Sequence, residues 1–169
     1  ATDGNVFWFD GTSFILFDKQ QDWIQRQINS IEKLEDGTIL LGDDKGITMY
    51  EKRSEGFKKK AALLTGKRVE QIFRDSNGVW VSTDRGLYHY ASTEAFKNQV
   101  LNKIYLPNKS IAAITSMGNK KYWISSDTVY KLDGNYLNTY DQSKGLLSSG
   151  GAIYYDAQGI TWFASAQGL

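Results

Sequence analysis

The sequence of 169 residues contains no cysteine and a single histidine, His89. Without cysteine there are no disulfides, thiolate nucleophiles or cysteine-ligated zinc sites, and one histidine excludes the usual histidine-rich metal sites. His89 stands between two tyrosines in a stretch whose alternate residues face opposite sides of a strand, so we expect a structural or surface role rather than a general base. We therefore expect no catalytic residue, no metal and no cofactor in this chain.

The sequence has neither an excess of charge of one sign nor a long apolar run. The 20 basic and 19 acidic side chains leave a net charge of +1, whereas nucleic-acid-binding domains carry a clearly basic face. The sequence has no run of 18 apolar residues, and residues 1–4 do not begin a signal peptide. We expect this segment to contact neither nucleic acid nor a membrane.

Proline is rare, whereas aromatic residues and glycine are abundant. One Pro stands against 5 Trp, 10 Tyr, 8 Phe and 16 Gly. Aromatic side chains fit a pleated, half-buried surface, so this composition favours β-structure. Chains of this kind are often built from repeats, which show as self-similarity at a fixed period.

A motif recurs along the chain. Residues 72–78 and 153–159 share Ile, an aromatic residue, Asp and Gly at the same offsets, and further copies lie at residues 28–44 and 111–127. The period is about 41 residues. A column that follows each motif holds Leu40, Trp80, Trp123 and Trp162, and a second column further on holds Gly46, Gly86, Thr128 and Gly168. Because several columns keep the same spacing, chance is a poor explanation of the repeat.

Each repeat contains four short stretches that are typical of strands. In the clearest copy these are residues 69–74, 79–82, 86–90 and 96–104. Turn sequences such as Asn77-Gly78 separate them, since both central residues of a type I′ turn need positive φ. Four strands in about 41 residues predict the blade of a β-propeller.

The phase of the repeat predicts the domain organisation. We expect an all-β chain of β-propeller blades, each of four antiparallel strands, with about four blade equivalents in one propeller segment, residues 1–169. Both ends fall within a blade, so we expect the segment to belong to a larger propeller of the seven-bladed type; a closed four-bladed ring and an eight-bladed ring of two chains remain alternatives. The expected parts are a half blade 1–23, blades 24–68, 69–110 and 111–150, and a half blade 151–169.

The run from Asp75 to Tyr88 resembles the two-component regulator propeller repeat, with its Asp/Gly turn, Trp strand, Thr and Gly-Leu. Gly145-Leu146-Leu147-Ser148-Ser149 resembles the connector that precedes the next inner strand in that family. The departures are Leu40 for Trp, Asp43 for Thr, and one deleted residue before Thr128.

The resemblance implies a periplasmic or other extracytoplasmic portion of an inner-membrane protein. In this family such segments sense ligands for hybrid histidine kinases of Bacteroidetes, which respond to polysaccharide fragments. The partners that it implies are an oligosaccharide, the remaining propeller blades and domains of the parent chain, and a second copy in a homodimer.

The topology expected for a propeller blade predicts which loops hold the ligand-binding residues. In a four-stranded blade, the connector into each first strand and the loop between the second and third strands open on one face, where propellers usually bind. Charged side chains in those loops suit hydroxyl, carboxylate or sulfate groups. The candidates are Trp23, Arg26, Asp44, Arg68, Asp84, Arg85 and Asp127. The recurrent tryptophans, by contrast, are expected to pack blade against blade.

The main hypothesis is a non-enzymatic segment that senses an oligosaccharide and signals across the membrane. Two alternatives remain. One is a propeller-fold lyase or other glycan-active enzyme, which would need a metal or an acid and base on one face. The other is a scaffold that docks another protein.

Overall fold

The computed structural model describes residues 6–17, 26–54, 56–119, 121–146 and 151–164. The chain divides into two compact units, residues 1–69 and 70–169, with the division at the start of a strand. Within the described residues, two short helices accompany sixteen β-strands. The all-β class expected from the composition is confirmed.

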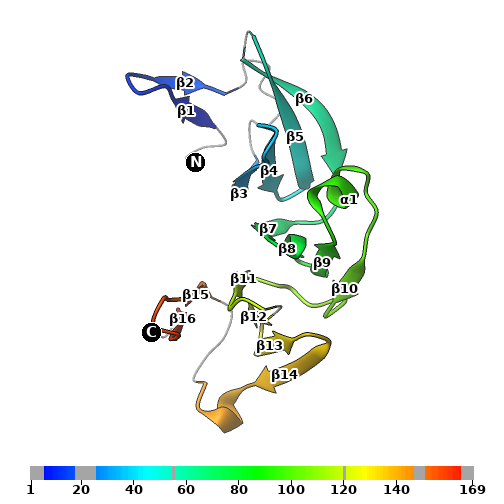
Figure 1. The fold of residues 1–169 in the computed structure, drawn as a ribbon, viewed down its shortest axis with the longest axis vertical. Helices are drawn as coiled ribbons and strands as arrows, with labels where there is room; N and C mark the ends of the chain where they lie inside the picture. The colour runs from blue at the N-terminus through cyan, green and yellow to red at the C-terminus, as the bar shows by residue number, and fades with distance from the viewer. Residues whose placement is uncertain (1–5, 18–25, 55, 120, 147–150, 165–169) are drawn as a thin grey trace. The chain divides into compact units, whose positions relative to one another are not determined.

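The first unit consists of a hairpin and a four-stranded antiparallel sheet whose strands follow each other in chain order (Figure 1). The strands are β1 (Phe7–Phe9), β2 (Phe14–Leu16), β3 (Ile28–Lys33), β4 (Ile39–Asp43), β5 (Gly46–Arg53) and β6 (Gly56–Leu63). Antiparallel neighbours need only short turns between them, which the Asp36-Gly37 sequence supplies between β3 and β4.

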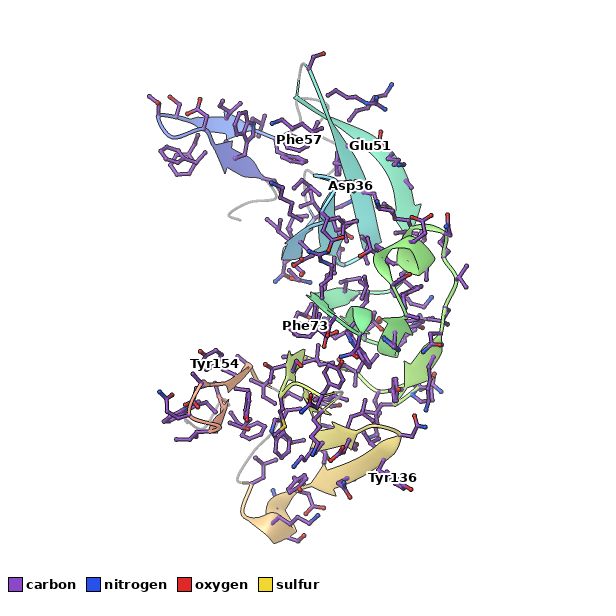
Figure 2. The ribbon with its side chains drawn as sticks, in the orientation of Figure 1. Asp36, Glu51, Phe57, Phe73, Tyr136 and Tyr154 are labelled. Atoms are coloured by element: carbon purple, nitrogen blue, oxygen red, sulfur yellow. The ribbon has the colours of Figure 1, made fainter. Side chains whose placement is uncertain are left out.

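The core of the first unit joins the hairpin to the sheet. Phe17 stacks on Phe57 with ring centroids 4.2 Å apart and meets Tyr50 edge-on at 5.2 Å. Glu51 and Phe57 mark the long β5–β6 hairpin in Figure 2. Lys58–Lys60 are exposed on β6, where Lys60 pairs with Glu51, so this basic run is a solvated outer strand.

The second unit contains two four-stranded antiparallel sheets, again in chain order, and a two-stranded pair. The first sheet holds β7 (Val69–Asp75), β8 (Gly78–Thr83), β9 (Gly86–Tyr90) and β10 (Lys103–Tyr105). The second holds β11 (Ala113–Ser116), β12 (Lys121–Ser125), β13 (Val129–Asp133) and β14 (Tyr136–Tyr140). The pair is β15 (Ile153–Tyr155) with β16 (Thr161–Phe163), and a 3₁₀ turn spans Gln142–Lys144.

The two sheets of the second unit pack face to face. β8 and β9 are buried along their whole length, whereas the outer strands β10 and β14 are mostly exposed. Trp80 and Leu87 of the first sheet share a core with Tyr122, Ile124 and Leu132 of the second. Burial on both faces explains why β8 and β9 read as continuous apolar and aromatic runs.

One predicted strand is wrong. The fourth strand, expected at residues 96–104, is the shorter strand β10. Helix α1 (Thr93–Lys97) precedes it and extends into the expected range. Ser92 caps the helix by accepting a hydrogen bond from the Ala95 amide at 3.0 Å, and Phe96 is fully buried edge-on against Tyr90. The local cap and the burial of Phe96 override the strand pattern.

The turn between the second and third strands is built in two chemically different ways. In the second unit, Thr83 Oγ1 accepts a hydrogen bond from the Arg85 amide at 3.0 Å. In the first unit, Asp43 Oδ1 accepts one from the Lys45 amide at 2.7 Å. The replacement of Thr by Asp therefore preserves the turn, since both side chains satisfy the same backbone donor.

The four-stranded sheets lie within the ranges 24–68, 69–110 and 111–150, and each is a meander of the kind that forms a β-propeller blade. The division of the chain into whole and half blades stays a prediction. None of the helices in the described part of the chain is both long and apolar enough to cross a bilayer.

Candidate functional site

The predicted rim residues of the first unit lie near the β4–β5 turn or near the start of β7. Arg26 donates to Asp43 Oδ2 at 3.1 Å, and Asp43 is almost fully buried. Asp44 and Arg68 are exposed. Trp23 lies outside the described residues.

The predicted rim residues of the second unit lie in the corresponding loops of its two sheets. Asp84 and Arg85 form the β8–β9 turn, with 3.9 Å between Arg85 Nε and Asp84 Oδ2. Asp127, between β12 and β13, accepts from Lys109 Nζ at 3.0 Å, and this contact lowers the pKa of the Asp127 carboxyl. Ion pairs that are exposed to solvent, as these are, contribute little to stability. The rim is therefore polar and charged, and it stays a predicted binding surface.

A pocket of about 520 Å³ lies between the two sheets of the second unit. Its buried wall is made of Trp80, His89, Tyr122 and Leu132, and Phe73, labelled in Figure 2, is packed against the same core. The remaining lining residues are Asn77, Ala91, Asn102, Tyr105, Gly134 and Asn135. A volume of this size is in the range of small-molecule sites, about 300–1,000 Å³.

Strand pairing sets the deepest part of the pocket. Trp80 of β8 lies directly opposite His89 of β9, and the two rings stack with centroids 3.8 Å apart and an interplanar angle of 18°. Tyr122 lies against the same indole at 4.5 Å and Tyr105 at 5.6 Å, both tilted. The indole faces are thus engaged by protein rings.

His89 is fixed by hydrogen bonds to both ring nitrogens. Nε2 lies 2.9 Å from the Asn77 carbonyl oxygen, and Nδ1 lies 3.0 Å from Asn102 Nδ2. Because a carbonyl only accepts, Nε2 carries the proton and Nδ1 accepts from the amide. Burial lowers the pKa of His89 from its ordinary value. The imidazole is therefore neutral and has no free nitrogen with which to act as a base.

A second polar group joins the two sheets beside the histidine. The Tyr122 hydroxyl donates to Asp75 Oδ2 at 2.7 Å and accepts from Asn77 Nδ2 at 2.9 Å. Burial raises the pKa of Tyr122, and the hydrogen bond to the carboxylate raises it further. The tyrosine thus stays a neutral donor that ties β12 to the turn between β7 and β8.

Trp80, in the wall of the pocket, and Trp123, outside it, each bury an indole Nε1. Trp80 is 2% exposed, and its indole Nε1 has no hydrogen-bond partner among the described residues. The amides at the mouth are accessible, since Asn102 and Asn135 are both exposed. A hydroxyl that entered the pocket would meet the carboxamides of Asn102 and Asn135 at its mouth.

The pocket and the predicted rim lie at opposite strand ends of the second unit. Asn77 follows the first strand of its sheet, whereas Asn102 and Asn135 lie between the third and fourth strands. Asp84, Arg85 and Asp127 lie between second and third strands, and antiparallel chains bring these loops to the other end. Sequence reasoning missed the pocket because Asn in a turn is explained by turn geometry alone.

Two tryptophans of the repeat column pack as expected, and the third, Trp162, lies in the two-stranded pair β15–β16. Trp80 contacts the ring of Tyr122 in the second sheet, and Trp123 of that sheet contacts the ring of Phe163. Trp162 is 48% exposed and donates from Nε1 to Asp156 Oδ2 at 2.8 Å. Among the residues described, no three acidic, histidine or cysteine side chains gather as a metal site would require.

No family model and no curated protein matches the sequence. Solved structures do match, over nearly the whole chain. The extracellular domain of the proposed hybrid two-component system BT4673 from B. thetaiotaomicron has a TM-score of 0.70 at 18% identity, over 96% of this chain and 24% of that one. That of BT3049, from the same organism, scores 0.65 at 20% identity, over 95% and 26%.

PorZ, a surface component of the type-IX secretion system of Porphyromonas gingivalis, has a TM-score of 0.76 at 13% identity, over 96% of this chain and 28% of that one. The chain thus spans about a quarter of the length of the structures it matches. Likeness at this identity shows the fold. The chain has the β-propeller fold found in extracellular domains of hybrid two-component systems, as its repeat residues predicted.

Proposed function

We propose that the chain is an extracytoplasmic ligand-sensing segment of a two-component regulator, a hybrid sensor histidine kinase held in the inner membrane. The observation that carries this proposal is the likeness, over 95–96% of the chain, to extracellular domains of two proposed systems of that kind. The run from Asp75 to Tyr88 supports the same role independently, because it resembles the propeller repeat of two-component regulators.

The ligand in this proposal is an oligosaccharide. Binding shifts the arrangement of this segment against the remaining propeller blades and domains of the parent, or against a second copy. Such a shift requires that the ligand bind one arrangement more tightly than the other. The kinase on the other side of the membrane then responds to the population of the favoured arrangement.

Two surfaces of the second unit are available to such a ligand. The pocket combines buried aromatic residues with amides at its mouth, the mixture typical of small-molecule sites. The loops of Asp84, Arg85 and Asp127 form the second surface, where Arg85 suits a carboxylate or sulfate group and the two aspartates can accept from hydroxyls. The pocket is the better supported surface because it is concave and is lined by aromatic rings and uncharged amides.

The geometry of His89 favours sensing over catalysis. A general base needs a nitrogen free to take a proton from substrate. Both nitrogens of His89 are engaged by Asn77 and Asn102, and burial holds its pKa low. The imidazole therefore supports the site as a positioning residue.

The function is tested in cells that express the protein, with a transcriptional reporter of the regulator's output and a panel of oligosaccharides. We expect one member of the panel to switch the reporter, and calorimetry to show that it binds the extracytoplasmic region. No response to any glycan, with capture of a protein partner instead, would replace sensing with the scaffold alternative. Turnover of a glycan would replace it with the enzymatic alternative.

A further inference from the structure

The lining of the pocket restricts the charge of what it can bind. Among the described residues that line it, none carries a charged side chain, and His89 is neutral. Two charged groups beside the lining are engaged with aromatic residues of the pocket. The Asp75 carboxylate accepts from the Tyr122 hydroxyl, and Lys103 Nζ lies 4.5 Å from the centroid of the Tyr105 ring. An ion that entered would lose its water without gaining a countercharge.

The lining also disfavours a flat aromatic ligand. Such a ligand binds by stacking on an exposed ring face. The indole of Trp80 is stacked on His89 at 3.8 Å and covered by Tyr122 at 4.5 Å, and Lys103 lies over the ring of Tyr105. The rings therefore form apolar walls rather than a stacking platform.

The polar groups of the pocket match hydroxyl groups. The carboxamides of Asn77, Asn102 and Asn135 come from three separate turns around the opening. Asn77 Nδ2 donates to Tyr122 and Asn102 Nδ2 to His89, whereas the exposed Asn135 can donate and accept, as a hydroxyl does. Several alternating donors and acceptors around a small apolar wall suit a ring that carries hydroxyls.

We propose that the pocket between the sheets β7–β10 and β11–β14 binds a single uncharged sugar ring, held by Asn77, Asn102 and Asn135 against Tyr105 and Leu132. The proposal rests on the proposed sensing function and names its ligand: the terminal or internal neutral residue of the sensed oligosaccharide enters here. Acidic and sulfated sugars are excluded by the uncharged lining. The rim at the other strand ends is not required for this contact.

The test is a calorimetric titration of the full chain with glucose, galactose, mannose and N-acetylglucosamine, and with glucuronate and glucose 6-sulfate as charged counterparts. We expect at least one neutral sugar to bind, and the matching charged sugar to bind with an affinity lower by about tenfold or more. The Trp80 indole N–H resonance, assigned with Trp80→Phe, should shift on binding because Trp80 lines the pocket. A charged sugar that binds as tightly as its neutral counterpart overturns the proposal.

Variants locate the binding. Asn135→Leu and Asn102→Leu should each weaken neutral-sugar binding about tenfold, because a buried ligand hydroxyl loses its partner. Asn138→Leu, at an exposed position of β14 outside the pocket, is the matched control and should bind as wild type. Asn135→Leu is the sharper variant because Asn102 also orients His89.

The outcomes separate this proposal from the sensing function. If Arg85→Ala abolishes sugar binding and Asn135→Leu does not, the rim is the site and the pocket proposal fails while sensing stands. If no simple sugar binds the chain at all, the pocket proposal fails, and the cellular reporter still decides the sensing function by its response to oligosaccharides.

Discussion

The second unit contains two successive interfaces between sheets, built on the same columns of the repeat. In the first, Trp80 lies opposite His89, and Tyr122 of the next sheet closes the contact. In the second, Trp123 lies opposite Lys131, and Phe163 of the next sheet meets the indole edge-on at 5.3 Å. The same tryptophan position thus supports a polar pocket in one interface and a contact between rings in the other.

The difference lies in the residues that face the tryptophan. His89 is buried and neutral, whereas Lys131 at the same place in the repeat keeps its amine 5.6 Å from the Trp123 ring centroid. Tyr122 precedes Trp123 in the sequence and reaches Asp75 of the previous sheet, whereas Thr161 precedes Trp162. The repeat specifies the scaffold, and departures from it at two columns specify the pocket.

The largest effect is expected at Gly78, where the turn that carries Asn77 enters β8. A Cβ at this position would lie 1.9 Å from the Tyr90 carbonyl oxygen, and φ is +126°. Gly78→Ala should lower the free energy of unfolding by about 4 kcal/mol or more, measured by urea denaturation. Gly37→Ala is the control: φ is +83° with open space around the Cβ, so about 1–2 kcal/mol is expected. Equal losses in the two variants would contradict the close packing assigned to Gly78.

The next effect concerns the hydroxyl that joins the first interface. Tyr122→Phe removes one partner of the Asp75 carboxylate and one of the Asn77 amide, which still bond to each other, so the free energy of unfolding should fall by about 1–3 kcal/mol. Tyr136, 79% exposed and labelled on β14 in Figure 2, supplies the matched control. Tyr136→Phe should change the free energy of unfolding by less than about 0.5 kcal/mol. If thermal and urea unfolding do not distinguish the two variants, the link through Tyr122 has no stabilising role.

A smaller and pH-dependent effect distinguishes His89 from its counterpart Lys131. Burial lowers the pKa of folded His89 from 6.5, so the unfolded chain binds more protons below that value. The free energy of unfolding therefore falls as the pH drops below about 6.5 and is fully retained above it. His89→Gln removes this component while the carboxylates titrate as before. The difference between wild type and variant should narrow from pH 7.5 to pH 5, and parallel curves would contradict a buried neutral histidine.

The smallest effect is expected in the second interface. Lys131→Met removes a cation 5.6 Å from the Trp123 ring centroid but keeps an apolar chain of similar length, so we expect a loss of about 0.5 kcal/mol or less. Lys103→Met, which removes a closer cation 4.5 Å from the Tyr105 centroid, should cost slightly more. A loss near 2 kcal/mol for Lys131→Met in urea denaturation would mean that this interface depends on charge as much as the first depends on hydrogen bonds.

Much of the fold could be predicted from the sequence because the repeat is local. Each sheet is a meander of neighbouring strands, so the spacing of Asn77-Gly78, Trp80 and Gly86 already determines which strands pair. Helix α1 could not be predicted by periodicity, since five residues give barely more than one turn. Its signal was the Ser92 cap followed by an acidic residue, Glu94, in the first turn.

The pocket could not be predicted because its members come from different sheets. Asn77 and Tyr122 are 45 residues apart and meet only when the two sheets pack. The sequence also directed attention to charged loops at the other strand ends, where Asp84 and Arg85 stand out by composition. Uncharged amides in turns carry no such signal, since each has a sufficient local explanation.

The central claim is that the pocket between the two sheets of the second unit receives an uncharged sugar ring. The most direct test is a crystal structure of the full chain grown with the oligosaccharide that activates the reporter. The account predicts a neutral ring between Tyr105 and Leu132, within hydrogen-bond distance of Asn102 and Asn135. A ligand bound at the loops of Asp84, Arg85 and Asp127, with the pocket empty at saturating concentration, would contradict it.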